Sequence, residues 1–176
     1  MNGSIKKSII ENEYYEKVTG HNDIQILLNN TNQLLRPYIE NTDLYKVTIN
    51  GNYVNTTNLH TVFSQRNKGN IPYSVAELSL NIHDRNVSRE VIDEKTEDSI
   101  IEISKNLTVV DFELSPTVII ESDNGENYII LEGNKRAVGM HLAQKTENLP
   151  ITRIVLGKTK LSWVSMLKQH KMRENA

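Results

Sequence analysis

The sequence contains no cysteine. Disulfide bonds, thiolate metal sites and cysteine nucleophiles are therefore excluded, and a reducing cytoplasm is the compartment that we expect. Long apolar stretches are missing as well, because no run approaches the roughly 18 consecutive apolar residues of a membrane-spanning helix. Residues 1–12 carry two lysines and a few isoleucines but no long apolar core, so we expect no signal peptide.

An excess of positive charge is also absent. The formal net charge is −2 at pH 7, whereas proteins that bind duplex DNA through counterion release usually have a basic domain. DNA binding would therefore need a local basic patch. Hydrophobic residues make up 38% and charged residues 24% of the 176-residue chain. This length allows one domain with a core, or a core with a smaller attachment.

The first part of the chain is expected to form a helix and a hairpin. Apolar residues recur at helical spacing over residues 23–39. An alternating run at residues 44–49 is followed by Asn50-Gly51 and then by the strand-like residues 52–54. An Asn-Gly pair between such runs predicts a β-hairpin, because both residues tolerate positive φ.

A polar stretch divides the sequence into two expected domains. Residues 64–70 contain no apolar residue and are the expected linker. The N-terminal helix and hairpin extension would occupy residues 1–65. The second domain, with a C-terminal helix, would occupy residues 71–176.

The second domain is expected to combine strands and helices. The expected strands are residues 73–80, 117–121, 128–131 and 151–156, and the expected helices are residues 93–107, 136–144 and 160–172. A turn at Asp123-Asn124-Gly125 would join two of these strands as a hairpin. The pattern predicts an α/β (α+β) fold, in which a small mixed sheet packs with helices and carries the N-terminal extension.

The most informative motif is the segment Glu132-Gly133-Asn134-Lys135-Arg136. It is expected to end an apolar strand and to begin a helix. Free backbone N–H groups and the dipole at a helix N-terminus favour phosphate, and glycine lets a ligand approach the backbone closely. Lys135 and Arg136 add positive charge. Glu132 could hold Mg²⁺ or accept a proton. The alternative is an ordinary turn with solvated charges.

The order of elements over residues 71–156 resembles the ParB/sulfiredoxin superfamily. The matching pieces are the polar box Leu80-Asn81-Ile82-His83-Asp84-Arg85-Asn86-Val87-Ser88-Arg89, the helix at 93–107, the hairpin that begins Ser115-Pro116-Thr117, and the segment Glu132-Gly133-Asn134-Lys135-Arg136-Ala137. The last piece is similar to the Gly-x-x-Arg nucleotide box of that superfamily. The resemblance implies a ParB/sulfiredoxin-like fold that binds ATP or another nucleoside triphosphate with Mg²⁺.

The resemblance also implies roles for individual residues. Glu132 would be catalytic and would hold the Mg²⁺ ion. Asp84 would be a second catalytic acid, near the place where the free-serine kinases of the superfamily carry one; alternatively, it caps a turn. The residues implied to bind the nucleotide are Gly133, Asn134, Lys135, Arg136, Arg89 and Arg85.

Three departures from the superfamily reduce the number of activities that the resemblance can imply. Sulfiredoxin needs a cysteine at the position of Asn134, so reduction of a sulfinic acid is excluded. Few residues follow Leu156, so we do not expect the helix-turn-helix and dimerisation domains of a chromosome-partitioning ParB protein. The basic box is reduced to Lys135-Arg136, which leaves the base of the nucleotide open.

The leading interpretation is a cytoplasmic nucleotide-binding protein that transfers or hydrolyses a phosphoryl group with Mg²⁺. Nuclease activity is another enzymatic alternative. The non-enzymatic alternative is a DNA-associated regulator or a protein-interaction module of a plasmid, phage or mobile element, acting alone or as a homodimer and without a membrane. A domain that keeps the fold but binds no nucleotide is the simplest alternative.

Overall fold

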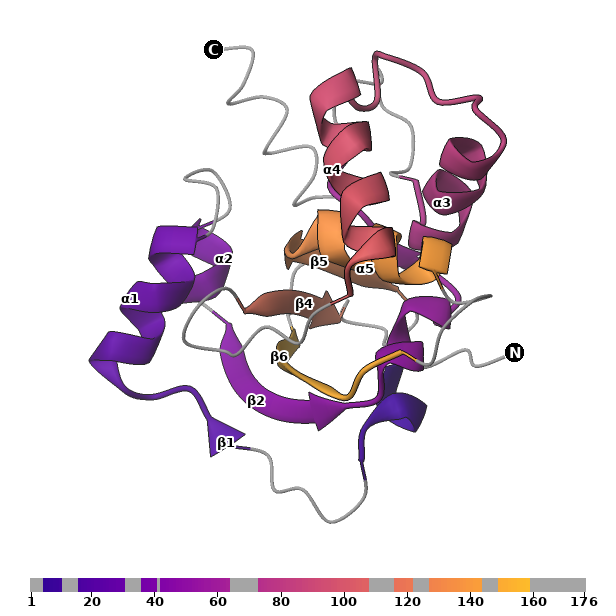
Figure 1. Ribbon diagram of the computed structural model, residues 1–176. Coiled ribbons are helices and arrows are strands. Elements are labelled where there is room, and N and C mark those ends of the chain that lie inside the picture. The colour runs from indigo at the N-terminus through magenta and orange to yellow at the C-terminus, as the bar shows by residue number, and fades with distance from the viewer. Residues whose placement is uncertain are drawn as a thin grey trace, which may run out of the picture.

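A six-stranded mixed sheet, with the strand order β1-β2-β6-β4-β5-β3, forms the centre of the computed structural model (Figure 1). The structure describes residues 5–10, 16–30, 36–40, 42–63, 73–107, 116–121, 127–143 and 149–158. The strands are β1 (Glu16–Lys17), β2 (Asp43–Ile49), β3 (Leu59–His60), β4 (Thr117–Glu121), β5 (Tyr128–Glu132) and β6 (Thr152–Lys158). The expected mixed α/β class is thereby confirmed.

Helices lie on both faces of this sheet. Figure 1 shows α1 and α2 on one side and α3, α4 and α5 on the other. Their bounds are α1 (His21–Asn30), α2 (Arg36–Glu40), α3 (Val75–His83), α4 (Glu94–Lys105) and α5 (Asn134–Ala143), and two short 3₁₀ helices are η1 (Ile5–Ser8) and η2 (Gly51–Asn55). Within the single helix expected at residues 23–39, the structure thus describes two helical segments. No helix in the described part of the chain is long and apolar enough to cross a membrane.

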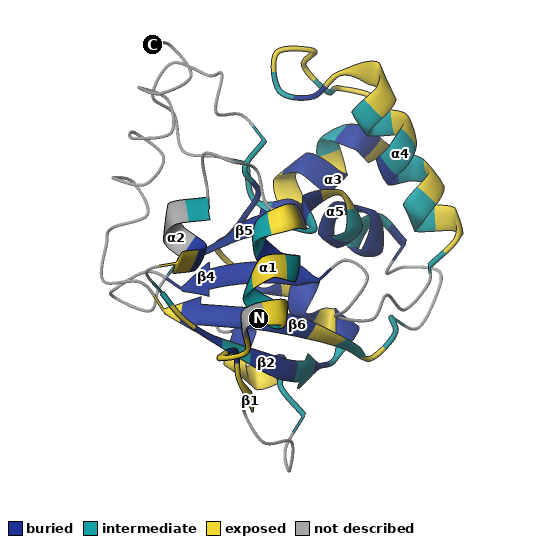
Figure 2. Cartoon of the chain, turned by 90° about the vertical axis from the view of Figure 1, so that its left-hand side faces the viewer, coloured by how far each residue is buried: buried dark blue, intermediate teal, exposed yellow. Residues whose placement is uncertain are grey.

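Two apolar cores separate the sheet from its helices. Side chains alternate between the faces of a strand, so Tyr128 and Ile130 of β5 pack toward α3 and α5, whereas Ile129 and Leu131 pack toward α1. Figure 2 shows the resulting band of buried residues through β4, β5, β6 and α5. Because the central strands are buried on both faces, they read in the sequence as continuous apolar runs.

Strands from both sides of the expected linker are neighbours in this sheet. β2 pairs with β6 in antiparallel orientation, and β3 pairs with β5 in parallel orientation. Residues 1–65 therefore supply both edges of the sheet, and residues 71–176 supply its middle. The linker at residues 64–70 lies outside the described residues.

Several expected elements are present close to their predicted positions. α4 begins at Glu94, and β4 spans the predicted residues 117–121. β4 and β5 pair in antiparallel orientation with Glu121 opposite Tyr128, as expected for a hairpin. The turn residues 123–125 and the C-terminal helix at 160–172 lie outside the described residues.

The strand expected at residues 73–80 is wrong, because this segment begins helix α3. Ser74 and Glu77 form a capping box: the Ser74 hydroxyl accepts a 3.1 Å hydrogen bond from the Glu77 amide, and the Glu77 carboxylate accepts a 3.0 Å bond from the Ser74 amide. These bonds satisfy amides that the first turn of a helix leaves without partners. The buried residues Val75, Leu78 and Ile82 follow helical spacing.

The hairpin expected at Asn50-Gly51 is wrong as well. Asn50 has a φ of −69° and caps η2, with its side chain accepting a 2.9 Å hydrogen bond from the Asn52 amide. Residues 52–54 therefore lie in a 3₁₀ helix and not in a return strand. Gly51 is needed for close packing: a Cβ atom there would lie 2.6 Å from the Cβ atom of Leu149.

Candidate functional site

The junction between β5 and α5 lies at an edge where strand C-termini converge. β3 is parallel to β5, and the chain of pairings through β6 and β4 makes β2 parallel to β5 as well. Ligands of α/β proteins commonly bind outside the carboxyl ends of parallel strands. β5 ends at Glu132, and α5 begins at Asn134 after a single intervening residue.

That intervening residue, Gly133, has a conformation that other residues rarely adopt. Its φ is +90°, and a Cβ atom would lie 2.5 Å from the hydroxyl oxygen of Thr117 in β4. Both the backbone angle and the space therefore require glycine. The backbone thus turns sharply against β4 before it enters α5.

Arg136, in the first turn of α5, reaches back to the same threonine. Its Nη1 atom donates a 2.9 Å hydrogen bond to Oγ1 of Thr117. Thr117 is 2% exposed, and Arg136 is half-buried. The guanidinium is therefore held beside Gly133 and the helix N-terminus, where it adds to the positive end of the helix dipole.

Tyr53 of η2 lies against this pair from a distant part of the sequence. Its side chain is 0% exposed. Burial raises the pKa of Tyr53 to about 12, and the Arg136 charge and the Thr117 hydroxyl act in the opposite direction. The hydroxyl faces these two groups, but it has no partner with hydrogen-bond geometry among the described residues. Sequence reasoning missed both Tyr53 and Thr117.

Asn134 lies at the site in a role that the sequence did not predict. It is 8% exposed, and its Oδ1 atom accepts a 3.0 Å hydrogen bond from the Val62 amide, just after β3. The side chain therefore fastens the start of α5 to the segment that follows the edge strand. The backbone amide of Asn134 belongs to the first turn, which is the part of a helix that can contact an anion.

Glu132 and Lys135 complete the loop. Lys135 is exposed and Glu132 is half-buried. Burial raises the pKa of Glu132 above its ordinary value, although the Gly133 amide and the charges of Arg136 and Lys135 partly oppose this. The carboxyl group therefore holds a proton more readily than an exposed glutamate does, which suits a group that accepts and returns a proton.

The raised pKa of Glu132 predicts a dependence of stability on pH. A folded-state pKa above the unfolded value means that the fold binds more protons, so the free energy of unfolding falls as pH rises from about 4.5 through the folded pKa. We expect Glu132→Gln to match the wild type at pH 4 and to be the more stable protein at pH 7. Urea unfolding at the two pH values measures this, and an unchanged difference between them would contradict it.

A magnesium ion at Glu132 would depend on the ligand for most of its coordination. The described part of the chain has no group of three or more His, Asp or Glu residues that could hold a metal ion. Mg²⁺ is usually bound through one or two carboxylates together with waters and substrate phosphates. The single carboxylate of Glu132, next to the N-terminus of α5, fits that pattern and does not fit a metal site made by protein alone.

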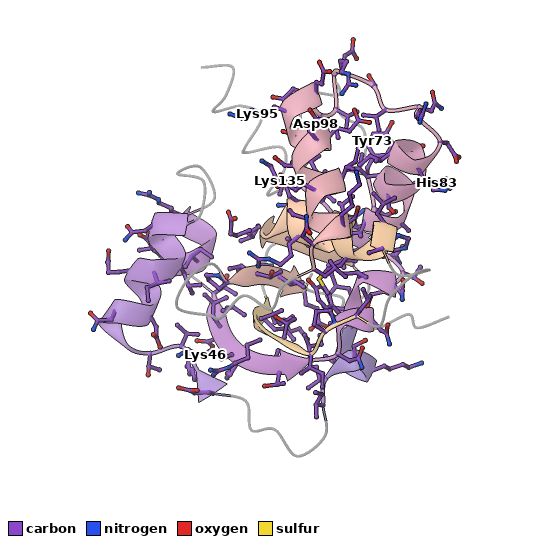
Figure 3. All side chains as sticks on the ribbon, viewed as in Figure 1. Lys46, Tyr73, His83, Lys95, Asp98 and Lys135 are labelled. Carbon is purple, nitrogen blue, oxygen red and sulfur yellow. The ribbon has the colours of Figure 1, made fainter. Side chains whose placement is uncertain are left out.

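The expected residues of the polar box lie in and after helix α3. Asp84 is the C-cap of α3, and its carboxylate lies 3.0 Å from Nδ1 of His83. Figure 3 shows His83 and Lys135 well apart, so Asp84 is not brought to the loop. Arg85 follows with a φ of 56° and an exposed side chain.

Arg89 forms an ion pair with a residue of α4. Its Nη1 atom lies 2.6 Å from Oε2 of Glu97. α4 packs on α5 at Gly139, where a Cβ atom would lie 2.7 Å from Ile103. Arg89 itself lies in the turn that precedes α4, and its described ion pair is with Glu97 of that helix and not with the loop.

The exposed side of α4 has an open hollow of about 550 Å³. Its lining residues are Asp93, Glu94, Lys95, Asp98, Ser99 and Glu102, and Figure 3 shows Lys95 and Asp98 there. Four of these six are acidic, so the hollow is unsuited to phosphate. The β5–α5 junction, which carries the basic residues, is the better candidate for an anion site.

Comparison of the chain with protein-family models, with curated proteins and with solved structures finds no match. The candidate site therefore stands on its own geometry.

Proposed function

We propose that the protein has a ParB/sulfiredoxin-like fold and binds ATP or another nucleoside triphosphate, with the phosphates at the first turn of α5. The observation that carries this proposal is the pairing of a glycine at φ +90° with a half-buried arginine held beside the same helix end. First-turn amides, the helix dipole and a planar guanidinium together favour an oxyanion. Lys135 adds a second, exposed charge.

The proposed activity is transfer or hydrolysis of a phosphoryl group. Such reactions need positioning and electrostatic stabilisation more than covalent chemistry. Arg136, Lys135 and the first-turn amides would hold the phosphoryl oxygens. Glu132 would orient the acceptor hydroxyl or water and take its proton, helped by its raised pKa. Alternatively, the Glu132 carboxylate would hold Mg²⁺, which would neutralise negative charge on the phosphates, and it would then not accept the proton.

The charge balance favours a nucleotide over duplex DNA as the ligand. The net charge of −2 and the acidic face of α4 would oppose a long polyanion. A single triphosphate needs only the local cluster of Lys135, Arg136 and the helix N-terminus. Catalytic or nucleotide-binding roles for Asp84, Arg85 and Arg89 are not needed for this binding mode.

Thermal unfolding with ATP, CTP, GTP and UTP, each with and without Mg²⁺, tests the proposal. A nucleotide at 100 times its dissociation constant stabilises the folded state by about 2.7 kcal/mol. We expect at least one nucleotide to raise the melting temperature of the wild type and to leave that of Arg136→Ala unchanged. Lys17→Gln is the control, because it removes an exposed charge that pairs with Asp43 in the distant strand pair β1–β2.

The outcome then directs the next assay. If Lys17→Gln responds like the wild type and Arg136→Ala does not, release or transfer of the terminal phosphate is measured next. If no nucleotide stabilises the wild type, the proposal fails. Binding of DNA or of a protein partner then becomes the leading hypothesis for the function.

A further inference from the structure

Three polar groups from three separate elements meet beneath Gly133. Arg136 comes from α5, Thr117 from β4 and Tyr53 from η2. The threonine hydroxyl accepts the bond from Arg136 at 2.9 Å, and its oxygen lies against Gly133. Tyr53 faces both groups from the core side. No residue of this cluster other than Gly133 and Arg136 has a part in the function proposed above.

The Tyr53 hydroxyl is unusual because it is fully buried and has no hydrogen-bond partner among the described residues. Leaving such a donor unsatisfied opposes folding, and phenylalanine would fill the same space without that cost. A buried hydroxyl of this kind requires an explanation. Thr117 and Arg136 are the groups that act on it electrostatically.

We infer that Thr117 and Tyr53 are positioning residues for Arg136, which orient its guanidinium toward an oxyanion bound at the first turn of α5. Because Thr117 fixes one N–H group, the planar fork is restrained before the ligand arrives, and less rotamer freedom is lost on binding. The buried Tyr53 hydroxyl lies next to Thr117 and limits how far the threonine side chain can turn away from Arg136. This inference rests on the proposed anion site.

A packing role alone predicts different behaviour. If Tyr53 merely fills the core, removing its hydroxyl changes neither ligand affinity nor the state of Arg136. If it is a positioning residue, Tyr53→Phe keeps or raises the melting temperature and still weakens binding. Thr117→Val and Thr117→Ser make the same distinction, since serine restores the acceptor that valine lacks.

The test measures the affinity of these variants for MgATP and for inorganic pyrophosphate by calorimetry. We expect Thr117→Val to bind about tenfold more weakly, Thr117→Ser to stay within about twofold of the wild type, and Tyr53→Phe to bind about threefold more weakly. Thr56→Val is the matched control, because the Thr56 hydroxyl is also buried and unpartnered among the described residues and lies on the C-cap of the same η2 helix. Its affinity should equal that of the wild type.

A second readout does not require a nucleotide. The side-chain Nη–Hη signals of Arg136 in NMR should be protected from exchange in the wild type and in Thr117→Ser, and should lose this protection in Thr117→Val. If the wild type binds neither probe, the proposed function fails and the inference that rests on it fails as well. If the wild type binds but Thr117→Val and Tyr53→Phe bind equally well and Arg136 is unaffected, the inference is overturned while the proposed function stands.

Discussion

Gly133→Ala is expected to lower the free energy of unfolding by about 2–6 kcal/mol. A non-glycine residue at φ +90° is strained by about 1–3 kcal/mol. The new Cβ atom would also lie 2.5 Å from Oγ1 of Thr117, and such overpacking costs about 1–3 kcal/mol more. Urea unfolding of the two proteins measures the loss, which would be a large share of the stability of a small domain.

Gly20→Ala is the matched control for this effect. A Cβ atom at Gly20 would meet only a carboxylate oxygen of Asp23, at 3.9 Å, so we expect a change within about 0.5 kcal/mol. A double variant separates the two causes. In the Thr117→Ala background the side-chain oxygen and Cγ2 are gone, so Gly133→Ala should cost less, although the backbone strain remains. Equal costs at Gly20 and Gly133 would show that the turn is not constrained as described.

Strong local signals explain which elements could be predicted from the sequence. β4 and β5 are apolar runs bounded by turn residues, and α4 begins with the cap Asp93, whose side chain accepts a 2.7 Å hydrogen bond from the Thr96 amide. Each of these signals lies within the element itself. The turn from β5 into α5 could be placed for the same reason.

Errors arose where a local pattern has two interpretations. The apolar residues before His83 also fit a strand, but Ser74 and Glu77 have the spacing of a capping box, which is a local signal for the start of a helix. At Asn50-Gly51 the sequence favours a hairpin, but Asn50 caps a 3₁₀ helix and Gly51 packs closely against Leu149. That neighbour is distant in sequence, and no local rule predicts it.

The deeper part of the site could not be predicted for a topological reason. Tyr53 reaches the loop because β2 joins the same sheet as β5, with β6 and β4 between them. Thr117 reaches it because β4 pairs with β5. A sequence without the strand order gives no reason to connect either residue with Arg136. The loop itself is local, whereas the groups that support it are brought together by strand pairing.

Asn134 offers a way to separate the stability of this loop from its binding of anions. Asn134→Ala is expected to cost about 1–3 kcal/mol, because the part-buried Val62 amide loses its acceptor. Asn134→Asp keeps an oxygen acceptor and places a negative charge at a helix N-terminus, which the dipole favours. We therefore expect its stability to lie within about 1 kcal/mol of the wild type.

Phosphate binding should respond in the opposite way. Asn134→Asp adds a negative charge beside the proposed position of the phosphates, and repulsion at such short range should weaken binding at least tenfold. Asn134→Ala introduces no charge, so its folded fraction should bind with a smaller loss. Calorimetry with MgATP, run beside urea unfolding of both variants, measures the two effects separately. A stable Asn134→Asp protein that binds like the wild type would mean that the anion lies elsewhere, because no phosphate at the first turn of α5 could be indifferent to that carboxylate.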